Sequence, residues 1–519
     1  MQSNDRKLLG QDMEDLLAEL PPRVSAPLFR HAAERPQAPA LSDQRGQRLT
    51  YAELAEKVRA MQDCLQQEGL QPGDRLMLVA ENCVELGVMI LAASELGAWP
   101  VIVNARMAWP ELQRIREHSQ PRLLVYLLAG EGATRHFREG RQDRGAREQE
   151  WAGYRFGVER DDSVAAEPDT ASGNEAVFTL LYTTGTTGDP KGVMLTHRNL
   201  LYVAAVTSAL RGLNPDDRVY LVLPVSHVFG LAAVFLACLH VGSELVLADR
   251  FDADMAMQTL EQRQITGLFG VPTMFAKLAD HVRLHGMPAG GLPYLRFMYS
   301  GGAPLEPGLK ADVEQRLGLP LLNGYGMTET APTICQVRFN EPLDSISVGK
   351  PLPGLDVRIT GADGQDVPRG EVGELHVRGP GNMRGYYRNP QATADLIDGD
   401  GFLNTGDLVR EDEDGNLFIA GRSKELIIHS GFNVYPPEVE AAISMHPEVL
   451  FCAVVGEVQD GNEEVVAYVQ RVAGSTLDAG ELSRFLRGSL TAYKRPGRFE
   501  FRDALPTAAS GKVLKHKLR

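Results

Sequence analysis

An alternation of capped helices with short apolar strands is the feature that most narrows the fold of this chain. Thr50 and Glu53 form a Thr-x-x-Glu capping box, and apolar residues follow them at helical spacing. Residues 76–80 then read as an apolar strand, residues 85–96 as a second helix and residues 100–103 as a second strand. Because strands that alternate with helices usually pair in parallel, the sequence predicts an α/β fold with a parallel sheet.

The pattern of expected helices and strands changes twice in the second half of the chain. The helix–strand alternation continues to about Val337, and glycine, proline and alternating strands from Val348 onward predict a β-rich subdomain. Beyond Lys424 we expect a compact αβ module with helices near 437–444 and 479–490. In residues 130–173, by contrast, charges of mixed sign crowd without periodicity, and we expect an irregular surface excursion there.

Composition excludes several classes of protein. A chain of 519 residues has room for two to four domains, and its longest uncharged apolar stretch, 228–239, is shorter than the ~20 residues of a membrane span. Residues 1–20 mix charges throughout, so no secretory signal is expected and a cytoplasmic location is predicted. Five isolated cysteines favour reduced thiols over zinc or disulfides, and a net charge of −15 disfavours a nucleic-acid partner.

The most informative segment for function is 181–193, an apolar strand that leads into a loop rich in Gly and Thr. Glycines let backbone N–H groups converge on an anion, threonine hydroxyls add donors, and Lys191 adds charge, so the loop suits a polyphosphate. It is not a Walker A loop, because Lys191 stands between Pro190 and Gly192 rather than before Ser or Thr. Taken alone, such a loop is as well explained by a plain turn.

The segment from Tyr182 to Gly192 resembles the Tyr-Thr-Ser-Gly-Thr-Thr-Gly-x-Pro-Lys-Gly phosphate loop of the adenylate-forming enzymes, the family of acyl-CoA synthetases, firefly luciferase and nonribosomal peptide adenylation domains. One position departs from that pattern, since Thr184 stands where serine is usual, but the hydroxyl is retained. Further motifs follow in the family's order as far as Lys512. The resemblance implies a large N-terminal domain, 1–422, of parallel-sheet subdomains and a β-rich one, joined to a small mobile αβ domain, 423–519.

The resemblance also implies a nucleotide site. The residues expected to hold ATP are Thr183, Thr184, Gly185, Thr186, Thr187, Gly188 and Lys191 in the phosphate loop, Gly302, Ala303, Asn323, Gly324 and Tyr325 around adenine, Thr328 at the α-phosphate, and Asp407 with Arg422 at the ribose. Glu329 is the expected Mg²⁺ ligand, in keeping with the preference of that ion for carboxylates and phosphate oxygens. Read singly, Asp407 would be only a turn residue and Glu329 a surface carboxylate.

The resemblance also implies which residues bind the carboxylic acid and which face the thiol acceptor. Pro224-Val-Ser-His227-Val-Phe-Gly resembles the Pro-x-x-His-x-x-Gly segment at the acyl end, and the expected pocket residues are His227, Val228, Phe229, Leu231, Met327 and Ala331. Their apolar character suits a fatty or aromatic acid better than a dicarboxylate. Lys512 and Lys191 are the expected catalytic lysines, with His227 beside them, Lys424 is the hinge, and Gly431 faces the thiol.

The C-terminal stretch supplies the basic patch that the acidic chain otherwise lacks. Residues 484–519 carry ten Lys or Arg against two Asp or Glu, a net charge of +8 that suits the phosphates of ATP and coenzyme A. Few aromatic residues accompany these charges, so the patch is a poorer match to nucleic acid.

The sequence therefore predicts a magnesium-dependent ligase that converts a carboxylic acid and ATP to acyl-AMP and pyrophosphate and then passes the acyl group to coenzyme A. A medium- or long-chain fatty acid is the expected substrate, since residues 429–436 and 491–496 look most like bacterial fatty acyl-CoA synthetases. The alternatives are an aryl-CoA ligase, an acyl-AMP ligase that loads a separate carrier protein, and an inactive nucleotide sensor. The sensor is disfavoured because Lys512, Glu329 and Asp407 are all present. Peripheral membrane contact and oligomeric state are left open.

Overall fold

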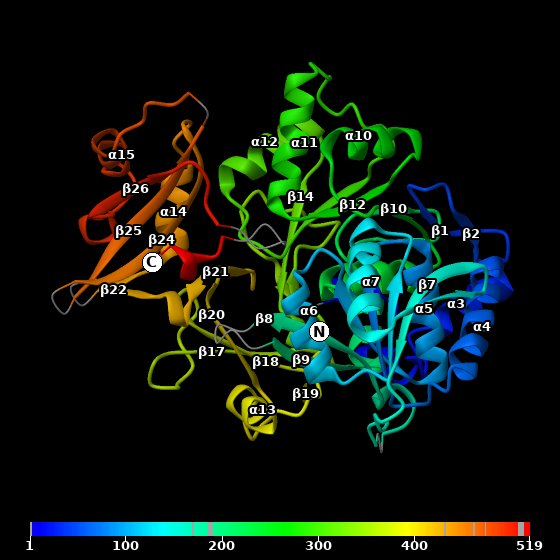
Figure 1. Cartoon of the computed structure of the whole chain (residues 1–519). Coiled ribbons are helices and arrows are strands. Elements are labelled where there is room, and N and C mark those ends of the chain that lie inside the picture. Colours follow the sequence, from blue (N-terminus) through cyan, green and yellow to red (C-terminus); the bar gives the residue numbers. More distant parts are fainter. Residues whose placement is uncertain are drawn as a thin grey trace.

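The computed structural model describes residues 3–168, 171–184, 190–429, 432–459, 462–472, 474–506 and 513–518. The chain forms two large sheets, a smaller β-rich sheet and a C-terminal αβ unit, and the C-terminal unit, orange to red, lies at the left of Figure 1. The predicted α/β fold class is confirmed.

The first sheet has eight strands in the order β19-β9-β8-β4-β3-β5-β7-β6. Its central pairs are parallel and its outer pairs antiparallel. The strands are β3 (Arg75–Ala80), β4 (Trp99–Asn104), β5 (Leu123–Leu127), β6 (Arg147–Trp151), β7 (Tyr154–Arg160), β8 (Val177–Thr184), β9 (Pro190–Thr196) and β19 (Gly385–Tyr386).

The second sheet has nine strands in the order β16-β15-β14-β13-β12-β10-β11-β1-β2, and the pairs from β14 to β1 are all parallel. Its strands are β1 (Pro39–Asp43), β2 (Arg48–Thr50), β10 (Arg218–Leu221), β11 (Glu244–Leu247), β12 (Gly267–Gly270), β13 (Phe297–Ser300), β14 (Leu321–Gly326), β15 (Thr333–Gln336) and β16 (Lys350–Pro351).

Helices cover and separate these two sheets. They are α1 (Ser3–Leu9), α2 (Met13–Ala18), α3 (Ala26–Glu34), α4 (Tyr51–Gln67), α5 (Val84–Leu96), α6 (Trp109–Ser119), α7 (Glu131–Arg144), α8 (His197–Leu210), α9 (Ala237–Val241), α10 (Ala253–Gln262), α11 (Pro272–Leu284), α12 (Pro307–Leu317) and α13 (Pro390–Leu396). Helix α5 is buried on nearly every side and contacts β3 and β4 of one sheet and β1 of the other. It thus lies in the largest hydrophobic core of the chain.

The capping box at the start of α4 is confirmed. The backbone N–H of Glu53 donates to Thr50 Oγ1 at 3.2 Å, and the N–H of Thr50 donates to Glu53 Oε2 at 2.8 Å. Each bond satisfies a donor that a helix start or its flank would otherwise leave unpaired, which fixes where α4 begins.

The expectation of an irregular excursion at residues 130–173 is wrong for its first thirty residues or so. Helix α7 and the antiparallel strands β6 and β7 occupy residues 131–160. In α7 the charges lie on the outer surface while Ala133 and Phe137, four residues apart, are buried at 0% and 4% exposure. His136 and Gly140 are buried as well, and because these two of the four buried positions carry no apolar side chain, the helical pattern is weak in the sequence.

The C-terminal half completes the molecule with two small units. The β-rich sheet has the order β17-β18-β20-β21, with β17 (Asp356–Thr360), β18 (Val372–Arg378), β20 (Leu403–Glu411) and β21 (Leu417–Arg422). After a short 3₁₀ turn, Ser423–Glu425, come the hairpin β22 (Ile427–His429) and β23 (Phe432–Val434), helices α14 (Pro436–Ser444) and α15 (Ala479–Leu486), and a sheet of β24 (Val449–Gln459), β25 (Asn462–Arg471) and β26 (Arg498–Arg502). This last unit has a hydrophobic core of its own.

No helix in the described ranges combines the length and the apolar content that a bilayer crossing needs.

Candidate functional site

The site is built where parallel strands of the second sheet end. Strands β10, β12, β13 and β14 are neighbours and run the same way, so the loops that follow them leave from one edge of the sheet. Ser300, the last residue of β13, stands opposite Gly270 on β12 and Asn323 on β14. This edge is where open α/β sheets bind their ligands, and every sequence-predicted loop of the second sheet meets there.

Glycine residues bring the loop after β10 against the loop after β13. A Cβ on Gly230 would lie 2.3 Å from the carbonyl oxygen of Pro224, so only glycine fits the turn that presents Phe229. A Cβ on Gly301 would lie 3.1 Å from the Phe229 ring and 3.5 Å from the carbonyl oxygen of Gly324. The Phe229 ring therefore packs directly on the backbone of Gly301. The acyl segment, 224–230, and the loop after β13 that is predicted to bind adenine thus form one continuous surface.

His227 is held with one ring nitrogen directed to its own loop. The backbone N–H of Phe229 donates to His227 Nδ1 at 3.2 Å, so in a neutral ring the proton is on Nε2 and that atom is left as a donor. The ring has solvent access but is surrounded by protein, and this desolvation lowers the pKa of His227 below its ordinary value. A neutral histidine that can donate one hydrogen bond is suited to orient a carboxylate oxygen.

The five apolar residues predicted to line the acyl pocket, here called the acyl wall, fall into two groups by their solvent exposure. Phe229 and Met327 are partly accessible, whereas Val228, Leu231 and Ala331 are 1%, 0% and 0% exposed. These three side chains lie in the main hydrophobic core, so in this structure they support the wall from behind and present no surface to a ligand. Their place in the acyl pocket stays a prediction.

At the ribose end, three predicted residues from different elements meet. The Tyr325 hydroxyl on β14 donates to Asp407 Oδ2 at 2.5 Å, and Arg422 Nε donates to Asp407 Oδ1 at 3.0 Å. Asp407 is 5% exposed and stands opposite Arg422 in the β20–β21 ladder. Each carboxylate oxygen can accept a second hydrogen bond, so the pair retains acceptor capacity for a vicinal diol. Burial and the adjacent Asp407 raise the pKa of Tyr325, which keeps its hydroxyl a donor.

Two predicted residues of the phosphate end are brought together by a tyrosine that the sequence did not single out. Glu329 is 7% exposed, and its Oε1 accepts a hydrogen bond of 2.7 Å from the Tyr386 hydroxyl. Lys191 Nζ lies 5.0 Å from the centre of the Tyr386 ring, within cation–π range. Among the residues that the structure describes, Glu329 Oε2 accepts no hydrogen bond, so one carboxylate oxygen is available to a cation as the Mg²⁺ prediction requires.

Tyr386 reaches this position through strand pairing. It is the second residue of β19, which pairs antiparallel with β9 and places Tyr386 opposite Val193. Burial and the nearby Glu329 carboxylate raise the pKa of Tyr386, so the hydroxyl stays protonated and donates. Nothing in the local sequence signals this role, because Tyr386 and Glu329 are 57 residues apart.

The remaining predicted residues are placed as follows. Thr183 stands opposite Lys191 in the β8–β9 ladder, and Thr328 is partly buried. Gly302 is exposed with φ +78°, Ala303 is partly buried, and Asn323 is 4% exposed with its side-chain amide committed to the carbonyl of Ile346 at 3.1 Å. Lys424 is exposed in the turn after β21. The side chain of Thr184 and all of Gly185, Thr186, Thr187, Gly188, Gly431 and Lys512 lie outside the described residues.

Charged groups of the C-terminal unit pair with one another, and one of its carboxylates lies near a carboxyl group of the large domain. Lys515 Nζ lies 2.8 Å from Glu440 on α14 and 3.1 Å from Glu425 in the linking turn. Glu306, in the loop before α12, is partly buried, and burial together with Glu440 raises its pKa to about 7. The predicted basic patch is thus partly neutralised by carboxylates outside it, since Lys494 also pairs with Glu438 at 2.6 Å.

Comparisons with known proteins agree with this arrangement. Residues 28–387 match the model of the AMP-binding enzyme family, and residues 438–512 match that of the AMP-binding enzyme C-terminal domain. Feruloyl-CoA synthase of Amycolatopsis sp. is 36% identical over 492 residues, which cover 94% of this chain and 97% of that protein.

Two solved structures superpose over nearly the whole chain. ATP-bound MatB from Rhodopseudomonas palustris has a TM-score of 0.84 and 31% identity, covering 96% of this chain and 98% of that one. O-succinylbenzoate coenzyme A synthetase of Bacillus subtilis in complex with ATP and magnesium ion has a TM-score of 0.79 and 29% identity, covering 95% and 98% of the two chains.

Proposed function

The chain belongs to the AMP-binding enzyme family and is an ATP-dependent, adenylate-forming CoA ligase, and we propose that its acid substrate is an aromatic monocarboxylic acid. The observation that carries the proposal is the Phe229 ring, which lies on the bare backbone of Gly301 beside His227. A flat apolar face next to a neutral hydrogen-bond donor suits a planar ring that ends in a carboxylate.

The relatives favour an aromatic acid over the fatty acid that the sequence predicted. Feruloyl-CoA synthase is named for an aromatic monocarboxylic acid, and O-succinylbenzoate coenzyme A synthetase for an aromatic acid that carries a second carboxylate. A fatty acid is the second candidate, because Phe229 and Met327 would also bind methylene groups, each worth ~0.8 kcal/mol when buried.

A second negative charge on the acid finds little support. Arg211 is a fully buried cation near these strands, but its guanidinium carbon lies 5.0 Å from the centre of the Phe269 ring and 5.1 Å from that of Tyr299. Burial lowers its pKa to about 10, and the side chain is 3% exposed. A cation enclosed in this way offers no accessible partner, and an unpaired carboxylate buried near the wall would cost several kcal/mol.

We assign the first half-reaction to the large domain. The acid's carboxylate attacks the α-phosphorus of ATP, the bond to pyrophosphate breaks, and acyl-adenylate forms. His227 orients the acid, Asp407 and Arg422 hold the ribose, and Lys191 spreads the negative charge that develops on the phosphates. Mg²⁺ bound by Glu329 supplies further charge neutralisation to the phosphate oxygens.

The second half-reaction requires the C-terminal unit to move. We place the domain boundary between Arg422 and Ser423 and the pivot at Lys424. Lys424 is exposed, and the units before and after it each have a hydrophobic core of their own. In this scheme Lys512 serves adenylation, and rotation then replaces it with the face that carries Gly431, where the thiol of coenzyme A attacks the acyl carbonyl and releases AMP.

A panel of acids with pyrophosphate detection tests the substrate proposal. A phenylpropenoic acid, octanoate and a C8 dicarboxylate are compared by kcat/KM, and we expect the aromatic acid to lead and the dicarboxylate to trail by at least tenfold. If octanoate has the highest kcat/KM, a fatty acid replaces the aromatic acid as the proposed substrate. A lead by the dicarboxylate would refute both, while leaving ATP-dependent ligation intact.

A further inference from the structure

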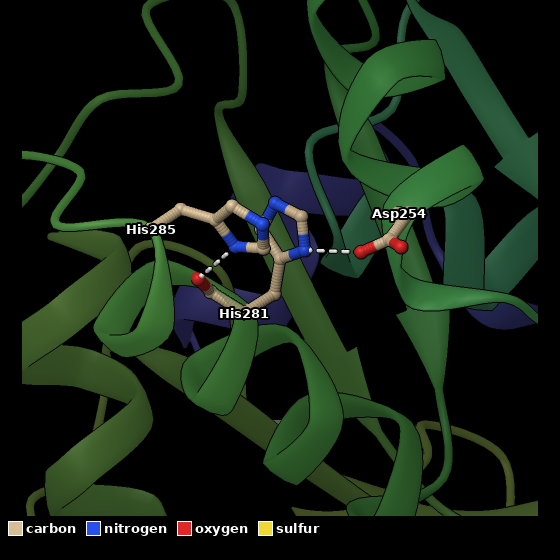
Figure 2. Close-up of side chains that lie close together, drawn as sticks. All are labelled: Asp254, His281 and His285. Carbon is tan, nitrogen blue, oxygen red and sulfur yellow. Dashed lines mark hydrogen bonds and ion pairs between the residues drawn. The ribbon is translucent and has the colours of Figure 1, made fainter.

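A cluster of two histidines and an aspartate lies on the outer surface of the second sheet's helices, and the reaction makes no use of it. His281 stands in the last turn of α11, His285 follows four residues later just beyond that helix, and Asp254 belongs to the first turn of α10. Figure 2 shows the two imidazole rings stacked over one another, with Asp254 at the far edge of His281. Their ring centroids are 4.0 Å apart at 26°.

Hydrogen bonds fix which nitrogen of each ring carries the proton. His281 Nδ1 lies 2.7 Å from Asp254 Oδ1, and His285 Nδ1 lies 2.9 Å from the carbonyl oxygen of His281. A carbonyl oxygen accepts hydrogen bonds only, and so does an ionised carboxylate, so both Nδ1 atoms donate. In neutral rings both Nε2 atoms therefore carry a lone pair, and neither has a hydrogen-bond partner among the residues that the structure describes.

We propose that His281 Nε2 and His285 Nε2 bind a divalent transition-metal ion of the Zn²⁺, Ni²⁺ or Cu²⁺ class. Metal-bound histidines usually donate their other N–H to a carboxylate or a backbone carbonyl, and this cluster has one partner of each kind in place. Metal–nitrogen bonds of ~2.1 Å in a tetrahedral site put two ligand nitrogens ~3.4 Å apart. The two rings, stacked here at 4.0 Å and 26°, tilt on binding so that both Nε2 lone pairs point at one ion.

The surroundings favour a cation of this class over the magnesium of the active site. The C-terminal end of α11 presents backbone carbonyls and the negative end of the helix dipole. Imidazole nitrogen suits zinc, nickel and copper, whereas Mg²⁺ prefers oxygen ligands. His281 is 12% exposed in its side chain and Asp254 is 73% exposed, so the site opens to solvent and water completes the coordination.

Equilibrium dialysis of the full chain against Zn²⁺ in excess Mg²⁺ tests the site. His285→Gln removes one ligand and should weaken Zn²⁺ binding at least tenfold, and Asp254→Asn removes the carboxylate behind His281 and should weaken it by ~10- to 100-fold. His446→Gln and Asp363→Asn are the matched controls, because both residues lie outside α10 and α11 in other units of the chain, and we expect their affinity to stay within twofold of the unmodified protein.

A second measurement covers the case in which a variant is less stable. Zn²⁺ should raise the melting temperature of the unmodified chain and raise that of His285→Gln much less, since a metal that binds only the folded state stabilises it. Zinc bound equally by the unmodified protein and by His285→Gln would place the ion elsewhere, for example on cysteines, and overturn the proposal. Absence of binding by the unmodified protein would do the same.

Discussion

Replacing Tyr386 with phenylalanine removes the hydroxyl that donates to Glu329 at 2.7 Å and keeps the ring that faces Lys191. A hydrogen bond to a charged group contributes ~1.5–3 kcal/mol, and Glu329 is only 7% exposed, so water replaces the lost donor poorly. If Glu329 must be held in place to bind Mg²⁺ with ATP, the whole loss appears in the adenylation step. At 1.36 kcal/mol per factor of ten, kcat/KM for ATP should fall by ~10- to 150-fold.

The adjacent tyrosine provides the control for this experiment. The Tyr387 hydroxyl donates to Glu167 at 2.5 Å, and Tyr387 is as buried as its neighbour, so Tyr387→Phe removes a comparable bond at the residue that directly follows β19. Pyrophosphate release is followed as Mg²⁺ and ATP are varied, and melting temperature is recorded for both variants. We expect similar stability losses, with the kinetic loss and a higher Mg²⁺ requirement confined to Tyr386→Phe. Equal kinetic losses in both variants, or a change of less than twofold in Tyr386→Phe, would refute the reasoning.

Three further predictions concern other parts of the site. Asp407→Asn removes the negative charge at the ribose end and should raise KM for ATP by about tenfold or more, as measured by initial rates; an unchanged KM would remove Asp407 from nucleotide binding. The pKa of about 7 at Glu306, caused by burial and by Glu440, means that its stabilising protonated form is fully present below the ordinary pKa of 4.5 and is lost as pH rises through about 7. Melting temperature should therefore fall between about pH 4.5 and 7 in the unmodified chain and less in Glu306→Gln, and parallel pH profiles would contradict this. Gly301→Ala places a Cβ 3.1 Å from the Phe229 ring and should cost bulky acids ~1–3 kcal/mol in kcat/KM while sparing acetate, so uniform losses across acids would argue against a wall at this point.

The sequence predicted the helices and strands well where local patterns carry the information. The capping box at Thr50 marks the start of α4, and the order of short motifs identifies Asp407 and Arg422, which the structure brings into contact. These signals are local, because a cap or a loop motif depends on a few consecutive residues.

Contacts across long separations could not be predicted in the same way. Tyr386 reaches Glu329 only because β19 pairs with β9, and a two-residue strand has no periodicity to detect. Apolar residues pose a related difficulty. Leu231 and Phe229 look alike in sequence, yet one is fully buried and the other lies at the surface of the site, because packing rather than hydrophobicity separates core from wall.

The charged contact between the two domains bears on how the C-terminal unit can rotate. Glu440 Oε1 already accepts from Lys515 and from the backbone N–H of Val454 inside its own unit, and Glu306 Oε2 has no hydrogen-bond partner among the described residues. Once Glu306 ionises, two carboxylates face one another at a partly desolvated contact, and their repulsion opposes the arrangement. An interface that loses stability near neutral pH is easily broken there, which is the property a domain needs if it must leave this position once in every turnover.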